Sequence, residues 1–166
     1  MPSFTPIFIP GLLCTELLFA KQRASLPNQG YIADTTRHDS IHDMAQAALD
    51  LCEGPLVPIG LSMGGYVALE MARLAPQRMA AMALLSTNCR DDSAESQRQR
   101  QQAIALAKQK GFQGVTRRLM PRLLSEAALQ DEAVVADVLA MAAEIGRIGF
   151  VQQQTAIMGR RAQRDT

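Results

Sequence analysis

Tryptophan is absent from this sequence, and histidine is almost as scarce. The 166 residues include two histidines, and none follows residue 42. Aromatic residues make up 4% of the chain, whereas nine methionines and many alanines and leucines supply the apolar bulk. A core of methionine, alanine and leucine is more pliable than a core of packed aromatic rings. The shortage of histidine matters more, because histidine is the commonest general base in enzymes.

A strong charge of either sign is also missing. The formal net charge is +1, with 48% hydrophobic and 20% charged residues, which is typical of a globular protein. A chain of this length forms one domain with a core, or one domain with a small added layer. Because a near-neutral chain has no electrostatic attraction for nucleic acid, we expect a small-molecule partner.

Close cysteine pairs and long apolar runs are absent as well. Cys14, Cys52 and Cys89 are odd in number and too widely spaced for a zinc site. We interpret them as reduced, mostly buried thiols. Residues 1–13 have no basic residue before a short apolar run, so they predict neither a signal peptide nor a membrane span. These features indicate a cytoplasmic protein without a cofactor, a metal or a membrane partner.

Strand-sized and helical segments alternate in the first half of the chain. The expected strands are Pro6 to Pro10, Tyr31 to Ala33, Leu56 to Ile59 and Met79 to Leu85. Helical spacing marks Ser40 to Leu51, with Ser40 as N-cap, and Met63 to Leu74. The alternation predicts an α/β fold with an open parallel sheet and flanking helices, in the order second, first, third, fourth.

That strand order makes two loops face each other. Ligands of open α/β sheets bind beyond the carboxyl ends of the strands, at the point where the strand order reverses. Gly11 to Leu13 leaves the first strand there, and Ser62 leaves the third. We therefore expect the functional crevice between these loops.

The second half of the chain has helical spacing and no strand-like run. The expected helices are Ser93 to Lys110, Phe112 to Leu119, Leu123 to Leu129, Glu132 to Ile145 and Phe150 to Met158. We predict that residues 1–88 form the N-terminal part of the core and residues 89–166 a helical cap over the crevice. The apolar composition of this cap favours a modest hydrophobic substrate.

The stretch Gly60-Leu61-Ser62-Met63-Gly64-Gly65 contains a G-x-S-x-G pattern. The pattern alone is weak, but here a strand precedes it and a helix follows. A side chain at Gly60 or Gly64 would obstruct the close approach of strand and helix around a strained serine turn. A purely structural turn is the alternative, since a serine becomes a nucleophile only beside a base. The phosphate-binding glycine motifs do not fit.

With these motifs the chain resembles the α/β-hydrolase family, in its capped serine esterase-like branch, over most of its length. The matching stretches are Ile7 to Cys14, Ala33 to Arg37 and Gly60 to Ala68. The resemblance implies that Ser62 is the nucleophile and that the backbone N–H groups of Leu12 and Met63 form the oxyanion hole. Donors of this kind contribute about 3–4 kcal/mol each. No cofactor is implied.

Two prolines depart from the pattern of the family. Members often carry a histidine where this chain has Pro10, which is tolerable because only backbone donors are needed there. Pro58 lies inside the expected third strand, where it removes a ladder hydrogen bond. We expect a local irregularity beside the serine turn.

The residues given offer no good base for Ser62. His38 follows the second strand, roughly 10 Å sideways from Ser62, and His42 lies one turn into a helix, so both are expected to be partly exposed helix-start residues. Asp34 is expected to be a turn or capping residue. In the family, the acid and the histidine come on strands after the cap. We therefore interpret the chain as the N-terminal portion of a longer hydrolase, with both residues beyond residue 166.

The expected sheet supports the same interpretation and leaves two functions open. Its last strand, residues 79–85, would have one unpaired edge without a flanking lysine or proline. One function is a serine hydrolase that acts on a small apolar ester or acyl compound through an acyl-Ser62 intermediate, the acid and base being absent from this chain, which alone would be inactive. The other is a non-catalytic binding module, or a hydrolase-like fragment that needs a complementary C-terminal segment or a second copy at its open edge. Esterase, thioesterase, carbon–carbon hydrolase and acyltransferase are not separated.

Overall fold

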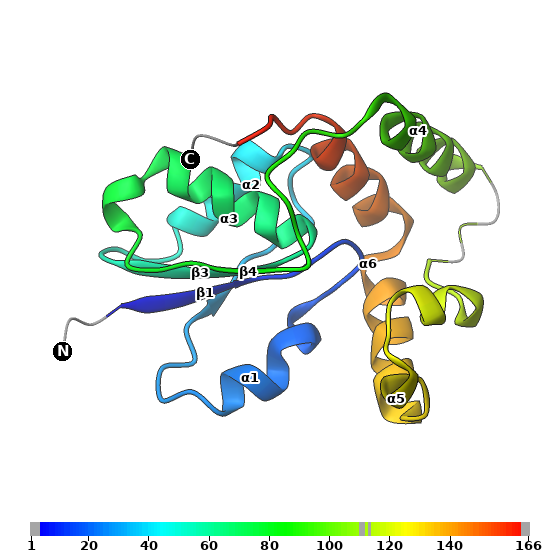
Figure 1. Cartoon of the computed structure of the whole chain (residues 1–166), viewed down its shortest axis with the longest axis horizontal. Coiled ribbons are helices and arrows are strands. Elements are labelled where there is room, and N and C mark those ends of the chain that lie inside the picture. Colours follow the sequence, from blue (N-terminus) through cyan, green and yellow to red (C-terminus); the bar gives the residue numbers. More distant parts are fainter. Residues whose placement is uncertain (1–3, 110–111, 113, 164–166) are drawn as a thin grey trace.

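Four parallel strands form a single sheet in the computed structural model, which describes residues 4–109, 112 and 114–163. The strands are β1 (Thr5–Ile9), β2 (Tyr31–Ile32), β3 (Leu56–Leu61) and β4 (Ala83–Leu85), in the order β2-β1-β3-β4 (Figure 1). The predicted α/β architecture and strand order are confirmed. β4 begins later than predicted, at Ala83, after an isolated pairing of Met79 with Leu56.

The first helices lie on opposite faces of this sheet. α2 (Ile41–Leu49) and α3 (Met63–Leu74) cover one face, and the 3-10 helix η1 (Glu16–Phe19) and α1 (Ala20–Ala24) lie on the other (Figure 1). A short 3-10 turn, η2 (Pro76–Arg78), follows α3. The predicted N-cap is confirmed, because Ser40 Oγ accepts a hydrogen bond from the Asp43 N–H at 3.2 Å.

The main core fills the space between the sheet and the α2–α3 layer. Ile7 and Leu56 from the strands pack with Val67 and Met71 from α3, and all four are fully buried. Each such side chain contributes about 1.5–3 kcal/mol to stability through its burial. The apolar stripes of α2 and α3 therefore fix the position of both helices on the sheet, including the N-terminus of α3.

The second half of the chain forms a helical group beyond the carboxyl ends of the strands (Figure 1). Its elements are α4 (Ala94–Lys108), η3 (Arg117–Arg122), α5 (Glu126–Leu129) and α6 (Glu132–Met158). We call residues 89–163 the cap. Within the described ranges, no helix is both long and apolar enough to cross a membrane.

The predicted cap helices are confirmed in part, and two of them begin later than predicted. The helix expected from Leu123 begins at Glu126, as α5. The helices expected at 132–145 and 150–158 are the two segments of α6, which meet at a kink at Gly146, where a φ of 64° and a ψ of −170° interrupt the helical backbone, so the predicted helix end at Ile145 is confirmed. The second segment begins directly after the kink rather than at Phe150. Helical backbone begins only at Arg117, so the helix predicted from Phe112 is wrong in its first part. The predicted helix end at Lys110 lies outside the described residues. Glycine tolerates the positive φ at 146 that stops a continuous helix.

α6 belongs both to the cap and to the main core. Ala156 and Ile157, near its C-terminal end, are buried in the main core. Further up the helix, Phe150 and Ala142 form a second apolar cluster with Leu13. The division of the chain at residue 88 therefore stays a prediction, because one long helix is shared by the two clusters.

Pro58 does not interrupt β3. The strand continues through it, and Pro58 pairs with Ile7 of β1. On the other side, Leu56 pairs with Met79 and Ile59 with Ala83, so three steps along β3 correspond to four along its neighbour. The irregularity expected at Pro58 is an extra residue on the neighbouring strand, in the manner of a β-bulge.

β4 forms one edge of the sheet within the described part of the chain. It pairs with β3 on one side. Leu84 and Leu85 are each 42% exposed, although both are large and apolar. An apolar strand with an unpaired side is a surface on which another strand can pair.

Candidate active site

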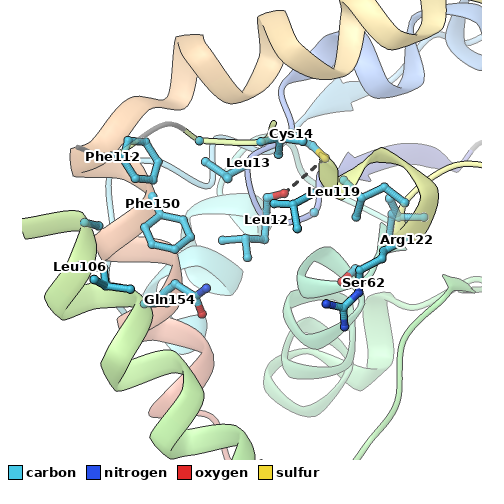
Figure 2. Close-up of a pocket in the computed structure, with 17 residues that line it drawn as sticks. Leu12, Leu13, Cys14, Ser62, Leu106, Phe112, Leu119, Arg122, Phe150 and Gln154 are labelled. Atoms are coloured by element: carbon cyan, nitrogen blue, oxygen red, sulfur yellow. Dashed lines mark hydrogen bonds between the residues drawn. The ribbon is translucent and has the colours of Figure 1, made fainter. Parts of the chain in front are cut away.

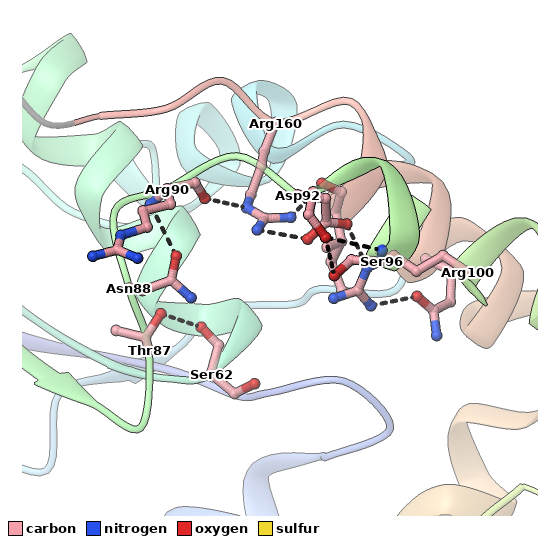
Figure 3. Close-up of polar contacts among 11 residues, drawn as sticks. Ser62, Thr87, Asn88, Arg90, Asp92, Ser96, Arg100 and Arg160 are labelled. Atoms are coloured by element: carbon pink, nitrogen blue, oxygen red, sulfur yellow. Dashed lines mark hydrogen bonds and ion pairs between the residues drawn. The ribbon is translucent and has the colours of Figure 1, made fainter. Parts of the chain in front are cut away.

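Ser62 lies on the turn between β3 and α3 in a backbone conformation that is rare for a residue with a side chain. Its φ of 53° and ψ of −112° place it where non-glycine residues are strained by about 1–3 kcal/mol. The Ser62 N–H donates to the Leu85 carbonyl at 2.9 Å, and the Thr87 hydroxyl donates to the Ser62 carbonyl at 2.8 Å (Figure 3). The strained turn predicted from the G-x-S-x-G pattern is confirmed.

Two glycines allow the turn to be this tight. A Cβ atom on Gly60 would overlap the carbonyl of Gly64, and a Cβ atom on Gly64 would overlap the carbonyl of Ile9. The predicted obstruction is therefore real at both positions. Close contact of the helix with β1 brings Ser62 beside the loop that follows β1.

That loop is held in place by a glutamine from the cap. Leu13 has a φ of 58°, and its N–H donates to the Gln153 Oε1 at 2.9 Å. Gln153 is 0% exposed, and its Nε2 donates to the carbonyl and the hydroxyl of Thr35 at 3.3 and 3.2 Å. α6 thus fixes the loops after β1 and β2 through one buried amide.

Two backbone donors beside Ser62 have no partner among the described residues. The N–H groups of Leu12 and Met63 donate no hydrogen bond to other residues in the described ranges. Leu12 lines the same cavity as Ser62, and Met63 is the first residue of α3, where the helix dipole favours negative charge. Met63 as a whole is buried, and its N–H lies at the N-terminus of α3 directly after the cavity residue Ser62. Free donors next to a serine hydroxyl are what an oxyanion requires.

A cavity of about 840 Å³ extends from Ser62 to the cap (Figure 2). Its wall is mostly apolar, with Leu106 from α4, Phe150 from α6, and Phe112 and Leu119 from the intervening segment. Arg122 is the one charged side chain among the described residues that line it. This volume suits a small organic molecule with most of its surface buried.

No histidine in the described part of the chain lines this cavity. The His42 Nδ1 lies 3.0 Å from the Oε1 of Glu70, and both residues line a separate hollow. Hydrogen bonds from Arg73 lower the pKa of Glu70; burial opposes this effect, and the hydrogen bond with His42 adds to it. His38 is not among the cavity residues either. Neither histidine is positioned to take a proton from Ser62.

Asp34 has the turn role that the sequence predicts. Its Oδ1 accepts hydrogen bonds from the Thr36 N–H at 2.8 Å and the Thr36 hydroxyl at 2.6 Å, and its Oδ2 accepts one from Arg37. Burial would raise the pKa of Asp34, but the hydrogen bonds from Thr36 and Arg37 outweigh it and the pKa is lowered. The side chain closes a turn after β2.

Cys14 lines the cavity but does not act as a second nucleophile. Burial raises its pKa to about 11, partly offset by a backbone hydrogen bond with Gly11, so the group is a neutral thiol near pH 7. All three cysteines are free. Cys89 is exposed and Cys14 and Cys52 are half-buried, so the prediction of mostly buried thiols is wrong for Cys89 and met only in part by the other two. Among the residues described, no three His, Cys, Asp or Glu side chains gather as a metal site would require.

Sequence reasoning missed a polar network within the cap, which links α4 to α6 and to the segments that flank them. Asp92 accepts hydrogen bonds from Arg100 at 2.6 Å and Arg160 at 2.8 Å (Figure 3). Burial would raise the pKa of Asp92, but the two guanidinium groups lower it. Arg100 also donates to the Gln154 Oε1 at 2.7 Å. Three consecutive glutamines at 152–154, in the mostly apolar last part of α6, were the available signal.

Comparison with known proteins adds a family and a fold. The family model of the thioesterase domain matches residues 20–157. A thermophilic esterase from Thermogutta terrifontis, solved with malate bound, matches with a TM-score of 0.87 and 23% identity, over 99% of this chain and 66% of that one. An enol-lactonase from Burkholderia xenovorans LB400 matches with a TM-score of 0.73 and 20% identity, over 96% of this chain and 67% of that one.

These matches also show how much of each solved structure corresponds to this chain. It spans about two thirds of the length of the solved structures that it resembles. At identities of 23% and 20%, the likeness concerns the fold. No curated protein sequence matches the chain significantly.

Proposed function

This chain belongs to the thioesterase-domain family and has the α/β-hydrolase fold, and from this premise we propose that it is part of a serine hydrolase whose nucleophile is Ser62. The substrate is an ester or a related acyl compound, and the reaction passes through an acyl-Ser62 intermediate. One observation carries the proposal: a strained serine, with a φ of 53°, lies at the wall of an apolar cavity beside two unpaired backbone donors.

The proposed first step is attack of the Ser62 Oγ on the acyl carbon. The new C–O bond forms as the carbonyl oxygen becomes an oxyanion, and the hydroxyl proton passes to a base. The N–H groups of Leu12 and Met63 donate to the oxyanion, for about 3–4 kcal/mol each. The N-terminus of α3 adds favourable potential. Collapse of the intermediate expels the alcohol or thiol, and water later releases the acid.

The acid and the histidine that this step needs are proposed to lie beyond residue 166. Two observations support this placement. The described residues bring no histidine to the cavity, and the esterase with the same fold has about a third of its length outside the match. The exposed edge at Leu84 and Leu85 could pair with a further parallel strand. On this proposal the chain alone is inactive.

The cavity supports a modest apolar acyl group as substrate, because most of its described lining is leucine, phenylalanine and alanine, and Arg122 is the one charged residue in that described lining. The family description makes a thioester a candidate beside an oxygen ester. We propose that the protein works in the cytoplasm and without a cofactor. Its partners are the substrate and, at the sheet edge, a complementary segment or a second copy.

A binding module without turnover is the second candidate function. The observation that favours it is the pairing of His42 with Glu70, which leaves Ser62 without a base among the described residues. On this alternative the cavity holds an apolar ligand, and Ser62 is only part of its wall.

Labelling with a fluorophosphonate distinguishes these candidates. The probe is applied to the 166-residue chain and to the protein encoded by the full reading frame, with Ser62→Ala and Ser86→Ala variants of each. Ser86 is the matched control, because it is also a serine with positive φ, 46°. Labelling of the encoded protein that is lost only in Ser62→Ala supports the hydrolase.

The other outcomes are equally informative. Labelling that needs the longer protein supports an acid and a base beyond residue 166. Full labelling of the 166-residue chain overturns that placement. Absence of labelling in both forms overturns the hydrolase and favours the binding module. Slow hydrolysis alone is not a criterion, since serine hydrolases without their triad still exceed the water rate by roughly a thousandfold.

A further inference from the structure

Gln154 places a polar group in the wall of the apolar cavity. It lies on α6 and lines the cavity together with Phe150 and Leu106. Only 6% of the residue is exposed. Figure 2 shows Gln154 on the cavity wall, across from Ser62, with its amide nitrogen turned toward Leu12. An amide at this depth needs an explanation, because buried polar groups are normally hydrogen-bonded.

Arg100 fixes which end of this amide is free. The Arg100 Nη1 donates to the Gln154 Oε1 at 2.7 Å, and the Arg100 Nε donates to Asp92 at 2.6 Å. A guanidinium group can only donate, so the atom that it contacts must be the oxygen of the amide. The Nε2 of Gln154 must therefore point the other way. Its orientation is set by a chain of side chains outside the cavity.

The Nε2 group has no partner among the described residues. Gln154 forms one side-chain hydrogen bond there, and it uses the oxygen. In the described ranges, Gln163 Oε1 is the single side-chain atom that is fully enclosed and lacks a hydrogen-bond partner. The Gln154 Nε2 is therefore not fully enclosed. An amide nitrogen without an acceptor among the described residues, in a residue that is 6% exposed and lines the cavity, is open to a molecule inside the cavity.

We propose that Gln154 is a specificity-determining residue that binds a neutral oxygen acceptor on the apolar part of the substrate. The substrate would then be an ester or thioester whose hydrocarbon portion carries a keto or hydroxyl oxygen at a distance from the reacting carbonyl. This inference rests on the proposed function, because it takes Ser62 as the reacting residue. The acceptor lies at the cap end of the cavity, and the reacting carbonyl lies at Ser62.

A neutral acceptor fits this end of the cavity better than an anion. The Gln154 donor is uncharged, and the charge of the neighbouring Arg100 is paired with Asp92. The unpaired cation of the described lining, Arg122, is seen beside Ser62 in Figure 2, across the cavity from Gln154. A carboxylate at the Gln154 end would lose its water without gaining a cation. A carbonyl or hydroxyl oxygen loses much less.

The test compares two phosphonate probes of equal length on the protein encoded by the full reading frame. Both are para-nitrophenyl esters that react with Ser62: the serine oxygen forms a bond to phosphorus, para-nitrophenolate leaves, and the serine proton passes to the base. One probe carries a plain n-heptyl chain, and in the other a distal methylene is replaced by a carbonyl. We expect the keto probe to react about tenfold faster, the size of one neutral hydrogen bond made in an apolar site.

Three variants assign the preference to the nitrogen of Gln154. Gln154→Glu keeps an oxygen for Arg100 but has no donor for the cavity, and Gln154→Met removes both. Both variants are expected to bring the keto-to-alkyl rate ratio close to one. Gln152→Met is the matched control, since Gln152 lies on the same helix and does not line this cavity, and it should keep the wild-type ratio.

The outcomes separate this inference from the proposed function. Reaction of both probes at the same rate in the wild-type protein overturns the role of Gln154 and leaves Ser62 as the nucleophile. A preference that survives in Gln154→Glu also overturns it, because the donor is then not responsible. Reaction of neither probe contradicts the proposed function itself. A side-chain amide resonance of Gln154 that shifts with the keto chain but not with the alkyl chain would confirm the contact directly.

Discussion

The side-chain oxygen of Gln153 on α6 accepts a hydrogen bond from the backbone N–H of Leu13, 140 positions earlier in the chain, at 2.9 Å. This contact holds the loop after β1 in a conformation with a positive φ, 58°, at Leu13. The cap therefore does more than cover the cavity. It shapes the loop whose Leu12 N–H is proposed to bind the oxyanion.

Replacing Gln153 should disturb both stability and reactivity. Gln153→Leu leaves the Leu13 N–H and the Thr35 hydroxyl without their partner, at about 1–3 kcal/mol for each unpaired buried group. We expect a loss of about 3 kcal/mol in the free energy of unfolding by urea, and slower phosphonylation of Ser62. Gln152→Leu on the partly exposed side of α6 is the control. Equal stabilities of the two variants would contradict the role of the Gln153 amide.

The strain at Ser62 can be measured by replacing this serine with glycine. Ser62→Gly relieves a positive φ of 53°, worth about 1–3 kcal/mol, against roughly 0.5–1 kcal/mol for the greater freedom of the unfolded chain. We expect a net gain of about 1 kcal/mol in the free energy of unfolding, with loss of fluorophosphonate labelling. Ser62→Ala keeps the Cβ atom and should stay within about 0.5 kcal/mol of wild type. A glycine variant less stable than the alanine variant would show that the turn is not strained.

Asp92 should be important for the stability of the cap. Asp92 and Arg160 side chains are both 5% exposed, and removing one partner of a buried ion pair costs about 3–5 kcal/mol. Asp92→Ala should lower the urea midpoint by a corresponding amount. Glu95→Ala is the control, because Glu95 pairs with Arg98 on the exposed face of α4 and should contribute less than about 1 kcal/mol. Similar losses of stability in both variants would mean that the buried ion pair of Asp92 contributes no more than the exposed pair of Glu95.

Glu70 should make stability depend on pH in the acid range. Hydrogen bonds from Arg73, opposed by burial and aided by His42, hold its pKa in the folded protein below the ordinary value. A carboxyl group with a depressed pKa contributes stability that is complete above its unfolded pKa, about 4.3. This stability is lost as the pH falls through the folded pKa.

Urea unfolding at a series of pH values between about 6 and 3 measures this effect. Wild type should lose stability steeply as the pH falls, and Glu70→Gln should show a smaller slope because one of the linked carboxyl groups is gone. Asp43→Asn, on the exposed part of α2, is the comparison for removal of an acidic residue. An unchanged slope in Glu70→Gln would contradict the proposed linkage.

Much of the core could be predicted because its signals are local. A strand-sized apolar run, a glycine pattern and a helical stripe follow one another from Leu56 to Leu74, and these three features fix the turn at Ser62. The strand order followed from the handedness of parallel connections. Ser40 could be predicted as an N-cap because the acidic residue Asp43 follows three positions later.

The cap could be predicted less well because its contacts are long-range. Gln154 and Arg100 are 54 residues apart in the sequence, and nothing local to either residue indicates the pairing. The kink of α6 at Gly146 was indicated by the glycine itself, whereas the packing of this helix on both apolar clusters was not. β4 begins later in the sequence than predicted because the extra residue opposite β3 interrupts the pairing of the two strands. This interruption depends on both strands and cannot be predicted from the sequence of one.

Pro58 in β3 removes one backbone hydrogen-bond donor from the sheet. The Ala80 N–H donates to the Leu56 carbonyl, so Leu56 and, by alternation, Pro58 direct their backbone groups toward the β4 side. Proline has no amide hydrogen, and it stands opposite residues 80–82, which are exposed and outside the strand. The missing donor therefore faces a segment of the neighbouring chain that is exposed to solvent. The strand that leads to Ser62 can therefore contain a proline and continue to Leu61.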